Sequence, residues 1–183
     1  MTRGPALALV ELSSIARGHR VADAMLKRAP VELWRAEWFS NGKYLVLVEG
    51  GVAAVEEAFA AGVAEGGDRI VDRLFLPQAH AALWPLLGGE MRGPAAIDSL
   101  GVVETATVAA AVLAGDAALK AAAVRLIELQ LGRGIGGKAF FTLTGALGEV
   151  EAAVEAALAI LDASALVATE IIAAPHADLG AKL

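Results

Sequence analysis

The chain has 183 residues, no cysteine and a formal net charge of −6, and 57% of its residues are hydrophobic. The absence of cysteine excludes disulfides, thiolate metal sites and cysteine nucleophiles, and the acidic balance argues against nucleic acid as a partner. The longest uncharged stretch, Leu74 to Gly89, contains two prolines and is too short for the ~20 apolar residues of a membrane helix. Glu11 interrupts the first apolar run, so we expect no signal peptide, no membrane partner and a cytoplasmic location.

The first half of the chain predicts the order strand, helix, strand, strand, helix, strand and short helix. Ser13 and Ser14 are suitable N-caps before apolar residues at helical spacing, and Ser40-Asn41-Gly42 predicts a tight turn between two strands. The expected elements are a strand over 6–11, a helix from 15 up to Pro30, strands over 31–39 and 43–48, a helix from 52 to 66, a strand over 70–76 and a helix over 80–87.

The second half repeats the first. Asp23-Ala-Met-Leu-Lys27 returns 93 residues later as Asp116-Ala-Ala-Leu-Lys120, and further along the chain the offset grows to 95 and then 96. Small insertions with restored register are typical of a tandem duplication, because loops absorb extra residues and packed elements do not. The expected second set is a strand over 100–104, a helix over 107–122, strands over 124–131 and 138–144, a helix over 147–161 and a strand over 166–173.

The duplication predicts two α+β domains, over residues 1–90 and 96–183, joined by a Gly/Pro-rich linker over 88–95. Each has the βαββαβ order of a ferredoxin-like sheet with its helices on one face, followed by a short terminal helix. The high apolar content of a chain that cannot enter a membrane suggests wide burial between subunits.

The order of the motifs resembles that of the bacterial microcompartment shell domain. Each half has a strand, an Asp-x-x-x-Lys helix, a hairpin with a glycine tip followed by lysine, and a second helix that carries Val-Glu. Two copies in the unpermuted order are similar to tandem-domain shell proteins that trimerise into pseudohexamers. The resemblance implies a structural, non-enzymatic tile in the shell of a microcompartment. Its partners would be itself in a homotrimer, hexameric tiles, pentameric vertices and small metabolites that cross a central pore.

By position, the resemblance implies that the two hairpin tips form the pore. Glycine there lets backbone approach a symmetry axis closely. The second tip is longer by two residues, and an ordinary glycine-rich turn is the alternative interpretation; its glycine spacing does not fit a dinucleotide loop. The pore residues expected in this way are Ser40, Asn41, Gly42, Lys43, Arg133, Gly134, Ile135, Gly136, Gly137 and Lys138.

Three of these residues, Lys43, Arg133 and Lys138, are basic. Positive charges around a narrow opening would favour anionic metabolites. The alternative is that they are solvated charges at the ends of strands.

The resemblance also implies contacts at the edge of the tile, for Lys27, Lys120, Gln78, His80 and His176. Each lysine follows an aspartate by four residues, so an ordinary helix pair is the alternative. Gln78 stands where the family often has arginine, which predicts weaker or different tile packing. A capping or edge role is expected for the two histidines rather than metal binding, and relatives that hold an iron–sulfur cluster use cysteines. No metal or cofactor is therefore expected.

Two other functions remain open at this stage. Ferredoxin-like repeats can place ligands between subunits, so an oligomeric small-molecule-binding regulator is the main alternative. An enzyme is the other, but a fold does not confer chemistry, and no nucleophile–base pair is apparent. Glu11 and Glu104 end equivalent strands and are expected to be structural rather than general bases.

Overall fold

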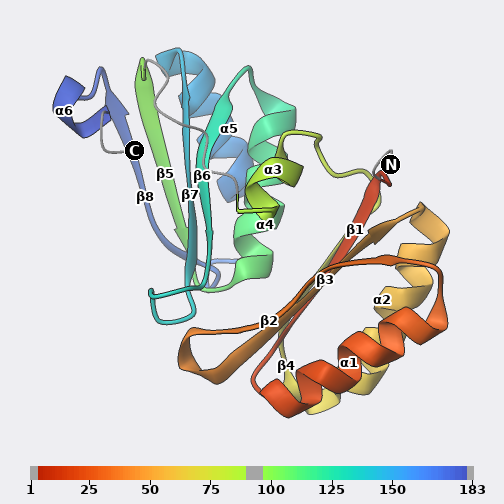
Figure 1. Ribbon diagram of the computed structural model, residues 1–183. Coiled ribbons are helices and arrows are strands. Elements are labelled where there is room, and N and C mark those ends of the chain that lie inside the picture. The colour runs from red at the N-terminus through yellow and green to blue at the C-terminus, as the bar shows by residue number, and fades with distance from the viewer. Residues whose placement is uncertain (1–3, 90–96, 181–183) are drawn as a thin grey trace. The chain divides into compact units, whose positions relative to one another are not determined.

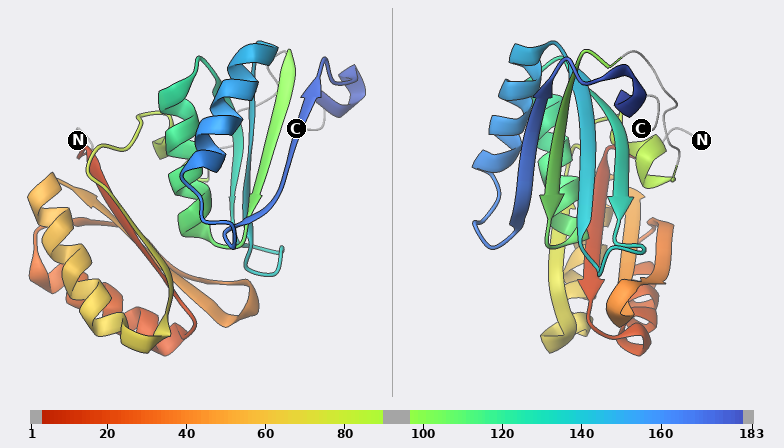
Figure 2. Two further views of the ribbon diagram at one scale, coloured as in Figure 1. Left: turned by 180° about the vertical axis from the view of Figure 1, so that it is seen from behind. Right: turned by 90° about the vertical axis from the view of Figure 1, so that its left-hand side faces the viewer.

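The chain folds into two α+β units in a computed structural model that describes residues 4–89 and 97–180 (Figure 1). Unit 1 comprises Met1–Ala79 together with the short segment Gly132–Gly137, and unit 2 comprises His80–Leu131 and Lys138–Leu183. Each unit has a four-stranded antiparallel sheet with a pair of long helices packed on one face (Figure 2). The expected pair of ferredoxin-like α+β domains is confirmed.

Unit 1 has the strand order β2-β3-β1-β4, in which β1 and β3 are central. Helices α1 and α2 pack on each other and on the sheet. The elements are β1 (Ala6–Leu12), α1 (Ile15–Arg28), β2 (Glu32–Phe39), β3 (Lys43–Gly50), α2 (Val52–Gly66) and β4 (Ile70–Leu76), with single 3₁₀ turns η1 (Ser40–Gly42) and η2 (Gly67–Arg69).

Unit 2 repeats this topology with the order β6-β7-β5-β8. Its elements are α3 (Leu83–Leu87), β5 (Ser99–Thr105), α4 (Val108–Ala121), β6 (Arg125–Leu131), β7 (Ala139–Gly145), α5 (Leu147–Ala159), β8 (Leu166–Ala173) and α6 (Ala177–Gly180). Even the irregularities coincide: β1 and β5 are both bulged near their last residues, and so are β2 and β6 near their first. One set of packing rules therefore builds both units.

Local sequence explains where the first helices begin. The Ser14 hydroxyl accepts a hydrogen bond from the backbone N–H of Arg17, and Thr107 does the same for Ala110. Such caps satisfy backbone donors that have no partner within the helix. The expected helix over 80–87 is wrong at its start, because α3 begins only at Leu83. His80 stabilises the turn before it instead: its Nδ1 accepts from the N–H of Ala82, and its carbonyl accepts from that of Leu83.

The compact units do not follow the repeat boundary at two places. The helix α3 ends the first repeat in sequence but packs against α4 and β6 of unit 2. The loop Gly132–Gly137 belongs to the second repeat but packs within unit 1. Most of the proposed linker, residues 90–95, lies outside the described residues.

Candidate functional site: the paired hairpin loops

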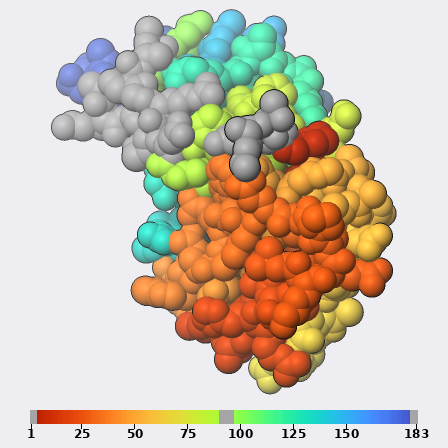
Figure 3. Space-filling view, turned by 45° about the vertical axis from the view of Figure 1, so that its right-hand side comes forward, coloured from red at the N-terminus to blue at the C-terminus, as the bar shows by residue number. Residues whose placement is uncertain are grey.

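The tips of the β2–β3 and β6–β7 hairpins meet within unit 1. The first tip, Ser40–Gly42, is a single 3₁₀ turn in which Asn41 and Gly42 have φ angles of 64° and 69°. The second tip, Gly132–Gly137, has four glycines with positive φ. Figure 3 shows this segment, in cyan, against the orange surface of the first hairpin.

Polar contacts tie the two tips together. The Asn41 side-chain amide donates to the Gly136 carbonyl at 2.7 Å, and the Gly134 backbone N–H donates to the Ser40 hydroxyl at 2.7 Å. The Lys43 ammonium donates to the Gly137 carbonyl at 3.2 Å. Residues expected separately from each repeat are thus brought into one cluster, which we call the loop pair (Ser40–Lys43 and Gly132–Gly137).

Glycine is required at Gly132 by both conformation and space. Its φ is +78°, and a Cβ there would lie 2.3 Å from the Phe39 ring. Side chains rarely adopt such a φ, and the buried ring cannot give way cheaply. The Gly-rich composition of the second loop therefore follows from its close contact with the first hairpin.

Glu37 on β2 connects the loop pair through charge. Its carboxylate is contacted by the guanidinium groups of both Arg35 and Arg133. Partial burial alone would raise the pKa of Glu37, but hydrogen bonds and Coulombic attraction from Arg35 and Arg133 outweigh it and lower the pKa below 4.5. Glu37 therefore stays ionised and ties Arg133 to unit 1.

The two lysines that follow the tips each form an ion pair with a strand glutamate. Lys43 lies 2.7 Å from Glu11, whose side chain is fully buried, and Lys138 lies 2.8 Å from Glu104, where both partners are half-exposed. All three basic side chains of the expected pore therefore have a carboxylate partner. This pairing reduces the positive potential that they can offer to an anion, so the hypothesis of anion selectivity gains no support from charge alone.

A small cavity opens beside the loop pair. It has a volume of about 340 Å³ and is lined by Glu37, Trp38, Phe39, Ser40, Arg133 and Gly134. The Trp38 side chain is largely exposed, whereas Phe39 is buried. Ile135 at the tip of the second loop is half-buried.

The residues expected at the tile edge lie in both units and differ in burial. In unit 2, the buried Asp116 accepts from the His80 backbone N–H at 2.7 Å and pairs with Lys120 at 2.5 Å. In unit 1, Lys27 pairs with Asp23 at 2.7 Å on an exposed helix face. Gln78 and His176 are exposed, and His176 caps α6 by accepting from the Asp178 N–H.

Within residues 4–89 and 97–180, no group of three or more histidine, aspartate or glutamate side chains could hold a metal ion. Among the helices of the same ranges, none combines the length and apolar character needed to cross a membrane.

The family of this fold is decided by its two repeats. Residues 6–79 and residues 99–175 each match the BMC domain. The chain belongs to the BMC-domain family.

Relatives of this BMC protein include proteins named as shell proteins. It is 37% identical to the bacterial microcompartment shell protein PduT of Citrobacter freundii, with 95% of both chains covered. A solved microcompartment protein from Desulfitobacterium hafniense superimposes with a TM-score of 0.84 at 39% identity, over 95% of this chain and 97% of that one. The carboxysome shell protein CsoS1 of Prochlorococcus marinus is 40% identical over 90 residues, which are 48% of this chain and 87% of that protein. The chain is therefore a tandem-domain shell protein, as its motifs predicted.

Some residues of the BMC site could not be found from the sequence. Glu37 is contacted by Arg133, which lies 96 residues away in the chain, and no local sequence pattern predicts that ion pair. Glu11 and Glu104 are expected from the sequence to be structural, but their lysine partners follow only from the pairing of the strands in the two sheets.

Proposed function

We propose that the protein is a structural tile of a bacterial microcompartment facet. In this proposal three chains form a closed pseudohexamer, with the loop pairs around a central pore that passes small metabolites. Hexameric tiles and pentameric vertices would be its neighbours, at edges that include Lys27, Lys120, Gln78, His80 and His176. The tile itself would carry out no catalysis. The similarity to PduT and CsoS1, both named as shell proteins, supports this role.

The observation that carries the trimer is a difference in exposure between equivalent residues. In unit 2, the helix α3 from the end of the first repeat packs on α4 and β6. The equivalent of α3 at the end of the second repeat is α6. The equivalents of α4 and β6, on which α3 packs, are α1 and β2. Compared pair by pair, the exposed residue and its covered equivalent are Leu26 (41%) and Leu119 (7%), Leu33 (38%) and Leu126 (1%), and Leu179 (42%) and Leu83 (0%).

If α6 of one protomer docked on α1 and β2 of the next, the exposed Leu179 on α6 and the exposed Leu26 and Leu33 on α1 and β2 would all be covered. The polar contact has an equivalent as well. Asp116 receives the His80 N–H, whereas its counterpart Asp23 is exposed and has Lys27 as its side-chain partner. The His176 N–H of a neighbouring protomer would supply the same bond to Asp23. Such a head-to-tail contact closes into a ring when the rotation fits, and two domains per chain make three chains equivalent to six tile corners.

The edge strands offer further surface for assembly. Exposed apolar side chains lie on the edge strands of the two described sheets: Trp38 on β2, Val71 on β4, and Val167, Ile171 and Ile172 on β8. Exposed apolar edges favour association between chains.

The trimer is tested by light scattering on the purified chain and on charged variants of the docking surfaces. We expect about 56 kDa for the native protein, three times the 18.6 kDa of one chain. Leu179→Asp and Leu26→Asp should each give the monomer mass, because burying an unpaired carboxylate costs several kcal/mol. Ile160→Asp, at an equally exposed site on the end of α5, serves as the control and should remain trimeric. Trimers that survive both docking variants would contradict the proposed contact.

The role in a facet is tested by electron microscopy of concentrated protein. Extended hexagonal sheets would support the tile, whereas discrete particles whose stability depends on a small ligand would support a regulator instead.

A further inference from the structure

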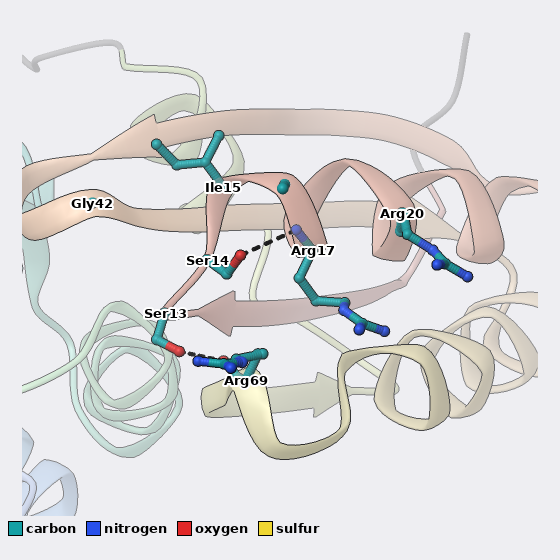
Figure 4. A pocket seen from close by; sticks show the side chains of 8 residues that line it. Ser13, Ser14, Ile15, Arg17, Arg20, Gly42 and Arg69 are labelled. Carbon is teal, nitrogen blue, oxygen red and sulfur yellow. Dashed lines mark hydrogen bonds between the residues drawn. The ribbon is translucent and has the colours of Figure 1, made fainter.

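We propose that a cavity of unit 1, at the start of α1, binds a small anionic molecule that carries a phosphate group. The cavity has a volume of about 600 Å³ and is lined by Ser13, Ser14, Ile15, Ala16, Arg17, Arg20, Gly42 and Arg69. Figure 4 shows that Arg17 and Arg20 come from α1, while Arg69 comes from the turn before β4. This site shares Gly42 with the loop pair but is otherwise lined by different residues, and it goes beyond the structural role of a tile.

The three guanidinium groups carry more positive charge than their partners neutralise. Arg17 and Arg20 share a single carboxylate, that of Glu65, at 2.9 Å and 3.0 Å. Arg69 has Asp68 at 3.7 Å, and both side chains are largely exposed. Three cations therefore face two carboxylates, and most of their N–H donors are not used by these pairs. An oxyanion in the cavity would accept hydrogen bonds from these donors and balance the excess positive charge.

The second repeat shows that the fold does not need these charges. By register, Arg17 and Arg20 correspond to Ala110 and Leu113, and Glu65 corresponds to Ile160. Arg69 corresponds to Ala165, because the Ser13 N–H donates to the Arg69 carbonyl as the Ala106 N–H donates to that of Ala165. Unit 2 builds the same sheet and helices with apolar residues at all four positions. A requirement of the unit 1 fold therefore does not account for the arginine cluster, and ligand binding does.

The chemistry of the cluster indicates the class of ligand. A guanidinium presents paired donors that match the oxygens of phosphate, and such charge-assisted hydrogen bonds are stronger than neutral ones. The site is a depression open to solvent, and its volume lies in the range of small-molecule pockets, about 300–1,000 Å³, so it can admit a phosphate that is part of a larger molecule. The Ser13 hydroxyl at the wall already donates to the Arg69 carbonyl at 3.2 Å, so the guanidinium groups supply the donors. Gly42, a member of the loop pair, also lines the site.

The test uses pyrophosphate as the probe and isothermal titration calorimetry on the full chain. We expect saturable binding to the native protein that weakens as salt is raised. The double variant Arg20→Gln with Arg69→Gln should bind at least tenfold more weakly, and both side chains are exposed enough to be replaced without loss of the fold. Arg28→Gln is the matched control, because Arg28 lies on the same helix, is similarly exposed and paired to Glu57, and does not line the cavity. It should change the affinity less than twofold.

A second variant keeps the proposal falsifiable if the double variant does not fold. Glu65→Gln removes the carboxylate that competes for Arg17 and Arg20, so it should tighten pyrophosphate binding severalfold, a gain that misfolding cannot produce. The proposal is overturned if the native protein shows no binding at millimolar pyrophosphate, if Arg28→Gln weakens binding as much as the double variant, or if Glu65→Gln weakens it. None of these outcomes depends on whether the chain forms a trimer.

Discussion

Replacing Lys43 by methionine should destabilise unit 1 far more than replacing Lys138 by methionine destabilises unit 2. The two lysines are equivalent in the repeat and each pairs with the glutamate of its central strand. They differ in burial: the Glu11 side chain is fully buried and Lys43 is 18% exposed, whereas Glu104 and Lys138 are 34% and 48% exposed. The duplication thus supplies a control for the same chemistry in a different dielectric.

The magnitudes follow from that difference. Removing one member of a buried pair typically costs about 3–5 kcal/mol, because the remaining charge stays in the interior. Removing one member of an exposed pair costs roughly 0–1 kcal/mol. Lys43→Met also removes the donor to the Gly137 carbonyl and so loosens the loop pair. We therefore expect a difference of about 2–5 kcal/mol between the two variants.

Urea unfolding followed by circular dichroism measures both free energies of unfolding. The protein concentration is held constant, since assembly contributes to apparent stability. Glu11→Gln with Lys43→Met should recover part of the loss, because no buried charge remains. Equal losses for Lys43→Met and Lys138→Met, or a neutral Lys43→Met, would refute the assignment of Lys43 as a structural tie and favour a pore charge instead.

Three further predictions concern packing, the helix pairs and pH. Gly18→Ala should destabilise unit 1 by about 1–3 kcal/mol in urea unfolding, because the new Cβ would lie 2.2 Å from the Tyr44 ring; adding Tyr44→Ala should recover part of this, since the second repeat has alanine at both positions. Asp116→Ala should lower the free energy of unfolding by about 2–3 kcal/mol, since it leaves the His80 N–H unpaired. In the isolated monomer, Asp23→Ala should lower it by about 0.5 kcal/mol or less. Thermal melts of both variants in the monomeric Leu179→Asp background measure the difference. Arg133→Gln should raise the pKa of Glu37 in a carboxyl NMR titration, and an unchanged pKa would contradict the tie. Because the folded-state pKa of Glu37 is lowered, its stabilisation is present well above the ordinary pKa of a glutamate, and it is lost as the pH falls through that ordinary value and then through the lowered pKa.

The sequence predicted the fold well because the signals were local and occurred twice. A cap at Ser14, glycine tips and apolar spacing place each element within a few residues of its observed bounds. Thr107, expected as the first residue of a helix, is the N-cap of α4. The expected start of α3 is wrong because His80 lies in the turn that precedes the helix, where its ring accepts from the Ala82 N–H. From the sequence alone, a histidine in the turn before a helix cannot be distinguished from one in its first turn, because histidine is neither a typical cap nor a helix breaker.

The site was predicted in part. Its loops followed from the resemblance, but their mutual contacts did not, because Ser40 and Gly134 are 94 residues apart. The sequence shows Lys43, Arg133 and Lys138 but not the carboxylates that pair with them, because those partners are distant in the chain. The arginine cavity left a signal that a comparison of the repeats could have found: Arg17 and Arg20 stand where the second copy has Ala110 and Leu113.

The central claim, a closed ring of three chains, is tested most directly by cross-linking. The chain contains no cysteine, so a double variant with Leu26→Cys and Leu179→Cys carries thiols only on the two proposed docking surfaces. After treatment with a short bismaleimide, denaturing gels should show covalent dimers and trimers, and the ladder should stop at three chains. Cross-linked species that continue beyond three chains, or only monomers when trimers are present before treatment, would contradict the closed ring.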